Sequence, residues 1–155
     1  MKQEALRYLS DIYSGASYIR TLDPTPLLDT KKLRFDNVAQ GRFKMVVKSF
    51  LLNTGMKFTH STASGYDIVQ AYLTNTDEML FDRAKAVDLL ILYLVSDPKN
   101  GHYGNILTSL IEARDLRNKH TWLFSLTTPD SPSFRSTYQP EFADYVGKQF
   151  TAIRG

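Results

Sequence analysis

The chain has no cysteine, one tryptophan, eight glycines and six prolines among its 155 residues. Without cysteine, neither a disulfide framework nor a thiolate metal site can form. Residues 1–15 include Glu4 and Asp11 and have no continuous apolar core, so we expect neither a secretory signal nor a membrane anchor. These absences favour a soluble, cytoplasmic protein that does not associate with a membrane.

Familiar catalytic and metal-binding patterns are also missing. The three histidines, His60, His102 and His120, show no metal-ligand spacing and no HExxH pattern. No GxSxG elbow presents a nucleophilic serine, and no pair of carboxylates lies in an apolar setting for acid and base catalysis. We therefore expect no catalytic residue, no bound metal and no cofactor.

Basic residues are concentrated in the first part of the chain. The formal net charge is only +3, but residues 1–60 contain ten Lys or Arg against five Asp or Glu. Residues 61–99 contain three against six. A basic segment of this kind can bind an anionic partner such as nucleic acid, although an ordinary solvated surface has the same composition.

Apolar residues 87–96 (VDLLILYLVS) form the most informative run in the chain. The run is too short to span a bilayer, and it is typical of a strand buried on both faces of a parallel sheet. Residues 102–119 have helical apolar spacing, and residues 121–126 (TWLFSL) form a second apolar run. The pattern predicts a strand, helix, strand unit and hence an α/β domain.

The rest of the chain extends this alternation. Residues 2–19 are expected to form a helical arm, which residues 20–35 join as a linker to an α/β core at 36–155, all within a single domain. The core is predicted to be a three-layer parallel sheet flanked by helices. Its further expected elements are a helix at 37–53, a strand at 57–61, a helix through 68–73, a helix at 77–86, a loop at 127–140 and a last helix through 142–153.

Polar residues follow each of the three expected strands. The carboxyl ends of parallel strands meet at one edge of a sheet, where loop N–H groups and helix N-termini also converge. A ligand would bind there, although ordinary turn and cap residues would give the same pattern. The candidate ligand residues at this edge are Ser61, Ser64, Asp97, Lys99 and Thr127.

Residues 42–126 resemble the core of AAA+ ATPases of the helicase-loader and transposition-helper branch, the DnaC and IstB type. RFKMVVKSFLLNTGMKFTHSTASGYDIVQAYL resembles the helix after their phosphate loop and the strand that follows it. VDLLILYLVSD resembles their Walker B strand, and GNILTSLIEARDLRNKHTWLFSL resembles the next helix and the sensor strand. The resemblance implies a P-loop-NTPase-like fold and a role in DNA replication or mobile-element machinery.

The sequence departs from that family where the ATPase mechanism needs specific residues. No GxxxxGK[ST] motif is present, and residues 35–44 (FDNVAQGRFK) offer one glycine and no Lys-Ser or Lys-Thr pair. By the same resemblance, the Walker B acids fall at Tyr93 and Leu94, and the sensor polar residue falls at Leu126. These departures predict an inactive relative, a pseudo-ATPase.

Three hypotheses follow. The first is a non-catalytic ATPase-like adaptor that engages a partner protein through the amino-terminal arm or the 127–140 loop, where Phe134, Arg135 and Tyr138 are expected to be exposed. The second is a small enzyme or ligand-binding domain that uses the strand edge, and the third is a structural or homo-oligomeric subunit. For the first hypothesis, the residues expected to touch nucleic-acid phosphates are Arg42, Lys44, Lys48, Arg114, Arg117 and Lys119.

Overall fold

A computed structural model describes residues 30–36, 39–53, 59–74, 78–94 and 103–154 of the chain. The expected helical arm lies outside these residues. Five strands form one sheet in the order β2-β3-β4-β1-β5, and every neighbouring pair is parallel. The strands are β1 Lys32–Asp36, β2 His60–Ser64, β3 Leu89–Leu94, β4 His120–Ser125 and β5 Thr151–Arg154.

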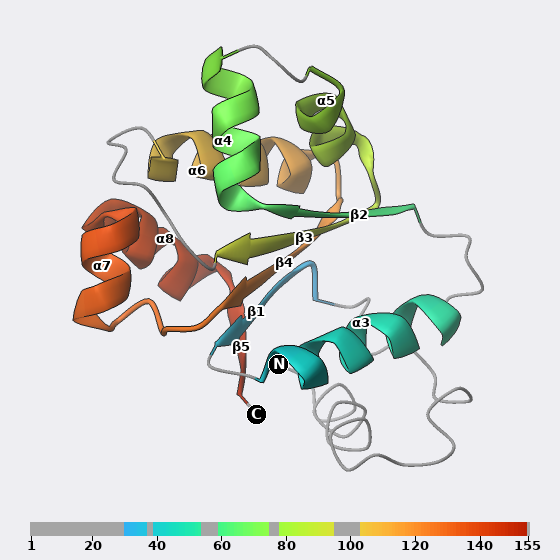
Figure 1. Ribbon diagram of the computed structural model, residues 1–155, viewed down its shortest axis with the longest axis horizontal. Coiled ribbons are helices and arrows are strands. Elements are labelled where there is room, and N and C mark those ends of the chain that lie inside the picture. The colour runs from blue at the N-terminus through green and yellow to red at the C-terminus, as the bar shows by residue number, and fades with distance from the viewer. Residues whose placement is uncertain (1–29, 37–38, 54–58, 75–77, 95–102, 155) are drawn as a thin grey trace.

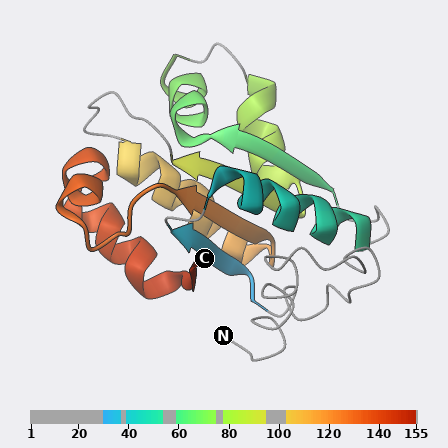
Figure 2. The same ribbon diagram turned by 60° about the horizontal axis from the view of Figure 1, so that its bottom comes forward.

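Helices cover both faces of the sheet (Figure 1, Figure 2). The chain crosses from β1 to the edge strand β2 through α3 and then returns through β3 and β4, so right-handed connections place α3 opposite the later helices. The expected three-layer α/β fold is therefore confirmed. The described helices are α3 Gln40–Asn53, α4 Gly65–Thr74, α5 Glu78–Ala86, α6 Tyr103–Leu116, α7 Pro132–Tyr138 and α8 Pro140–Gln149.

Alternating side chains of β3 and β4 supply two apolar layers. Leu92 of β3 and Leu123 of β4 belong to the core cluster under α4 to α8. Trp122 and Phe124 point the other way and meet Phe43 and Phe50 of α3. This period of two buries both faces of the central strands, as the apolar run at 87–96 predicted.

Two strands lie where the sequence predicted other structure. β1 (Lys32–Asp36) lies between β4 and β5, and its residues 32–35 were assigned to the linker. The edge strand β5 (Thr151–Arg154) includes residues 151–153, which were assigned to the last helix. The β2 strand also begins at His60, three residues later than the expected start.

The expected loop at 127–140 contains a helix. The Ser131 hydroxyl accepts a hydrogen bond from the Phe134 N–H, and Pro132 occupies the first turn, so α7 has a well-formed amino-terminal cap. Phe134 and Tyr138 are 1% and 4% exposed, packed in the core with Phe142. The expectation of exposed aromatic docking residues here is wrong, because the helix turns both rings inward.

Candidate functional site

The first part of the candidate site is the connection from β1 to α3, at the carboxyl edge of the sheet. Asp36 ends β1, is 3% exposed and pairs with the guanidinium of Arg34. α3 begins at Gln40, and Gly41 stands in its first turn. A buried carboxylate therefore stands at the end of the strand that, in a P-loop protein, leads into the phosphate-binding loop.

The GxxxxGK[ST] pattern can be laid over this connection with Gly41 as its second glycine. Asp36 then replaces the first glycine, Arg42 replaces the lysine and Phe43 replaces the hydroxyl residue that ligates Mg²⁺. Arg42 is exposed, whereas Phe43 is fully buried. The charge of the lysine is thus kept at this position, and the hydroxyl ligand is not.

An aromatic cluster fills the space between α3 and the ends of β3 and β4. The ring of Phe43 lies 4.7 Å from that of Phe124 and 5.6 Å from that of Tyr93, meeting Tyr93 edge-on at 82°. Burial raises the pKa of Tyr93, so its phenol stays neutral. Phe43 and Tyr93 stand at the two positions where Mg²⁺ ligands are expected, and their rings contact each other in an apolar environment. Neither side chain can supply a charged oxygen to the ion.

The residue at the expected sensor position, Leu126, follows β4 and is 54% exposed. Ser125 before it is buried, and its hydroxyl donates to the Thr127 carbonyl at 2.8 Å and accepts from the Thr127 N–H at 3.2 Å. These bonds hold the turn after β4 together.

The candidate ligand residues at the strand edge do not converge. Ser61 is the second residue of β2, away from its carboxyl end, and the Ser64 hydroxyl accepts from the Asp67 N–H at 3.0 Å as a cap of α4. Thr127 follows β4, which β3 separates from β2. Asp97 and Lys99 lie outside the described residues.

α3 carries three of the candidate nucleic-acid contacts. Arg42, Lys44 and Lys48 are all exposed, and α3 contains no acidic residue. Lys44 and Lys48 are one helical turn apart and therefore share a face, whereas Arg42, two residues before Lys44, points to a different side of the helix. We call Lys44 and Lys48 the α3 basic face.

The other three candidates lie elsewhere, and Arg114 cannot contact a ligand because it is fully buried. Its guanidinium donates to the carbonyls of Ala84 at 2.6 Å, Val87 at 2.8 Å and His120 at 2.6 Å, and to the Thr121 hydroxyl at 3.0 Å. Burial lowers its pKa to about 10, which leaves it charged at neutral pH. Arg114 therefore fastens α5, α6 and β4 together at the amino edge of the sheet.

Lys119 and Arg117 lie close to Arg114 in the chain, in the turn between α6 and β4. Lys119 forms an ion pair with Asp88 at 3.0 Å, and Arg117 is exposed. The six candidate residues thus do not form one surface.

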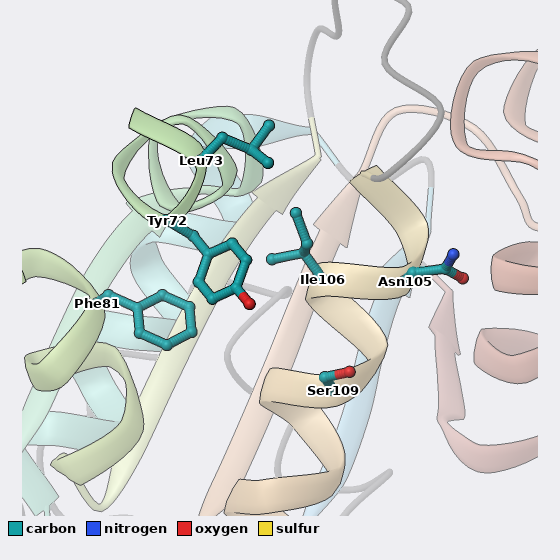
Figure 3. Close-up of a pocket in the computed structure, with 6 residues that line it drawn as sticks. All are labelled: Tyr72, Leu73, Phe81, Asn105, Ile106 and Ser109. Carbon is teal, nitrogen blue, oxygen red and sulfur yellow. The ribbon is translucent and has the colours of Figure 1, made fainter. Parts of the chain in front are cut away.

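An apolar groove, which the sequence reading did not identify, lies between α4, α5 and α6 (Figure 3). Its volume is about 390 Å³. The signal for it was present in α4, where Tyr72 and Leu73 add apolar side chains beyond the buried positions Ile68 and Val69. The groove is lined by Tyr72, Leu73, Phe81, Asn105, Ile106 and Ser109.

The described residues contain neither a cluster of metal-binding side chains nor a helix that could span a membrane. No three side chains of His, Cys, Asp or Glu in this part of the chain gather closely enough to hold a metal ion. Among the helices of the described segments, none is long and apolar enough to cross a membrane.

The parallel sheet and its helices define the class of fold as α/β and P-loop-NTPase-like, and solved structures of replication proteins share this fold. The DnaC helicase loader matches with a TM-score of 0.60 and 15% identity, over 99% of this chain and 91% of the loader chain. DnaI matches with a TM-score of 0.61 and 11% identity, over 97% and 79% of the two chains.

The replication initiator DnaA from Aquifex aeolicus, bound to AMPPCP, matches with a TM-score of 0.60 and 12% identity. The match covers 94% of this chain but only 44% of DnaA, so this chain spans less than half of the initiator's length. No protein-family model and no curated protein matches the sequence. The similarity to replication proteins is therefore one of fold.

Proposed function

We propose that this chain is a non-catalytic, AAA+-like adaptor of DNA replication or mobile-element machinery. It would bind a partner protein and contact nucleic-acid phosphates, without binding or hydrolysing ATP. The observation that supports the non-catalytic part most strongly is the contact between Phe43 and Tyr93. This contact joins the residues at the two positions where the active relatives would hold Mg²⁺.

Electrostatics support the same proposal. Asp36 places a buried carboxylate at the end of β1, and its ion pair with Arg34 cancels the charge of that cation. Arg34 is therefore not available to attract a triphosphate. ATP would lose the Mg²⁺ site, and of these two cations only Arg42 would attract its phosphates.

The nucleic-acid part of the proposal rests on the α3 basic face. Lys44 and Lys48 provide two exposed cations on one face of a helix without acids. Such cations bind phosphates without reading sequence, so binding should be weak, non-specific and sensitive to salt. Replication initiators and helicase loaders with the same fold supply the context, including a DnaA structure that holds single-stranded DNA.

Titration of a labelled single-stranded oligonucleotide, followed by fluorescence anisotropy at several salt concentrations, tests this part. Two phosphate contacts predict that log K falls with log salt with a slope of about −1.4, and the double variant Lys44→Glu/Lys48→Glu should abolish binding. The control Arg83→Glu/Lys148→Glu makes the same charge change at exposed positions on α5 and α8. If the two double variants weaken binding equally, net charge and not the α3 basic face is responsible, and this part fails.

The second hypothesis, an enzyme or ligand-binding domain at the strand edge, has less support. Of its described candidates, Ser64 caps a helix, Thr127 bonds within a turn, and Ser61 lies away from the edge. Homo-oligomerisation remains a prediction that sedimentation of the full chain would test.

A further inference from the structure

The strand β2 forms one edge of the sheet, and its backbone can pair with a further strand. The Thr59 carbonyl accepts a hydrogen bond from the Leu89 N–H at 2.9 Å, so the odd-numbered residues of this segment direct their backbone groups at β3. His60 and Thr62 therefore direct their N–H and C=O groups away from β3, as Ser64 does its N–H. Within the described part of the chain, β2 pairs with β3 alone (Figure 2).

The composition of β2 does not protect this edge. Natural edge strands avoid unwanted pairing through charged residues, proline, a bulge or very short length. β2 (HSTAS) contains no Asp, Glu, Lys, Arg or Pro, and its register with β3 is continuous over five residues. The opposite edge strand, β5, has four residues and ends with Arg154. Of the two edges, β2 is therefore the one suited to pairing.

One face of β2 is also left uncovered by the helices. His60 and Thr62 are exposed, whereas Ala63, on the other face, packs against the core cluster under α4 to α8. The aromatic rings of α3 contact β1, β3 and β4. A strand that pairs with β2 would therefore lie beside a solvent-exposed face and would not displace α3.

We propose that β2 pairs with β2 of a second copy of this chain, antiparallel about a two-fold axis that passes through Thr62. In that register Thr62 lies opposite its own counterpart and exchanges both backbone hydrogen bonds with it. The His60 carbonyl accepts from the Ser64 N–H of the other copy. Cross-strand Thr pairs are favourable, and no Asp, Glu, Lys or Arg side chain of β2 opposes a like charge.

Self-pairing suits this edge better than capture of an extended segment of another protein. Domains that bind such segments select them through pockets for alternate side chains beside the edge strand. The groove between α4, α5 and α6 includes no residue of β2 and does not serve this edge. A two-fold axis needs no pocket, because it sets two identical strands against each other and covers both edges at once.

The dimer would form one continuous sheet with both copies of α3 on the same face. A two-fold axis perpendicular to the sheet exchanges the two copies without turning their faces over. One nucleic-acid strand could then contact the α3 basic faces of both copies, with higher avidity than a single copy provides. This consequence rests on the proposed function, whereas the pairing of β2 does not.

Sedimentation equilibrium of the full chain, without nucleic acid, tests the dimer. The wild type should show a dimer fraction that rises with concentration. Thr62→Lys sets two ammonium groups against each other across the axis and should raise the dimer Kd at least about tenfold. The control Ser136→Lys makes the same charge change at an exposed position of α7 and should leave the Kd unchanged. Mixing Thr62→Lys chains with Thr62→Glu chains should restore the dimer, because opposite charges then meet.

Cross-linking tests the register independently. The chain has no cysteine, so Thr62→Cys introduces a single thiol. Residues that exchange both hydrogen bonds in an antiparallel pair have Cα atoms about 5.5 Å apart, a separation that a disulfide spans. Mild oxidation should therefore cross-link Thr62→Cys chains into dimers much faster than Ser136→Cys chains.

Three results would overturn the proposal: a monomer at every concentration, a dimer that folded Thr62→Lys leaves intact, or equal cross-linking of the two cysteine variants. Urea unfolding establishes that each variant is folded, and the cysteine pair decides if Thr62→Lys is not. Titration with oligonucleotide separates the hypotheses. A dimer that does not bind oligonucleotide contradicts the nucleic-acid part of the proposed function, and a monomer that binds it contradicts only the pairing of β2.

Discussion

At the residue scale, Arg114 shows how a basic side chain can be structural. Sequence reasoning treats a cation near a helix end as exposed, although the spacing from Leu107 and Ile111 places Arg114 on the buried face of α6. Its acceptors Ala84, Val87 and Thr121 come from segments that only the tertiary fold brings together. The burial of this side chain therefore had a local signal, whereas its hydrogen-bond partners could not be predicted from the sequence.

Replacing Arg114 should destabilise the protein strongly. Arg114→Ala leaves several buried carbonyls without donors, and we expect a loss of about 3–5 kcal/mol in the free energy of unfolding. Urea unfolding measures it. Arg114→Lys should recover only part of the loss, because an ammonium cannot reproduce the fork of donors. A change below about 1 kcal/mol for Arg114→Ala would contradict this role.

The Asp88 carboxylate should contribute stability that depends on pH. The hydrogen bond from Lys119, together with bonds from the backbone and side chain of Thr59, lowers the pKa of Asp88 below its usual 3.8. The contribution is complete above pH 3.8 and is lost as the pH falls through the lowered folded-state value. The stability difference between the wild type and Asp88→Asn should therefore be constant from pH 7 to about pH 5 and shrink in more acidic buffer. Urea unfolding at each pH measures this difference, and one that grows on acidification would contradict the assignment.

At the element scale, the elements that the sequence reading missed carried weak but readable signals. In β1, the apolar residues Leu33 and Phe35 alternate with the charged residues Lys32, Arg34 and Asp36, which is the period of a strand. The segment was assigned to a linker because Pro24 and Pro26 before it cannot continue a helix. β5 has only four residues and directly follows α8, so helical periodicity masks it.

Glycine substitutions should distinguish tight from open helix packing. A Cβ at Gly104 of α6 would lie 2.8 Å from the Cβ of Phe142 and 3.0 Å from the Tyr138 carbonyl, whereas one at Gly147 of α8 would meet nothing within 4 Å. Gly104→Ala should lower the thermal midpoint. Gly147→Ala should raise stability by about 0.5–1 kcal/mol, since alanine favours the helix interior. Equal effects of the two changes would mean that α6 and α8 do not pack as described.

At the scale of the whole molecule, the sequence predicted the fold class, because a central parallel strand is a local pattern. The loss of nucleotide chemistry, read from the missing phosphate-loop motif, stays a prediction. The groove depends on three helices that only the tertiary arrangement brings together, so the sequence signalled no more of it than the extra apolar residues of α4.

The same aromatic contacts provide a probe of α3. Trp122 is the only tryptophan in the chain, and its ring lies 4.8 Å from that of Phe50 on α3 and 5.4 Å from that of Phe35 on β1. Phe43→Ala should cost about 3–5 kcal/mol, and Trp122 fluorescence should follow the loss of this layer during urea unfolding. A cost below about 1 kcal/mol would mean that the aromatic cluster does not hold α3 on the sheet.

We propose above all that the aromatic cluster has replaced the nucleotide site. Isothermal titration of the full chain with ATP and Mg²⁺ tests this claim most directly, with a thermal-shift assay on the same samples. We predict no saturable heat and no rise in the thermal midpoint at millimolar ATP. Saturable binding with a micromolar Kd that Arg42→Ala abolishes would contradict the claim, because it would place a working phosphate site at the start of α3.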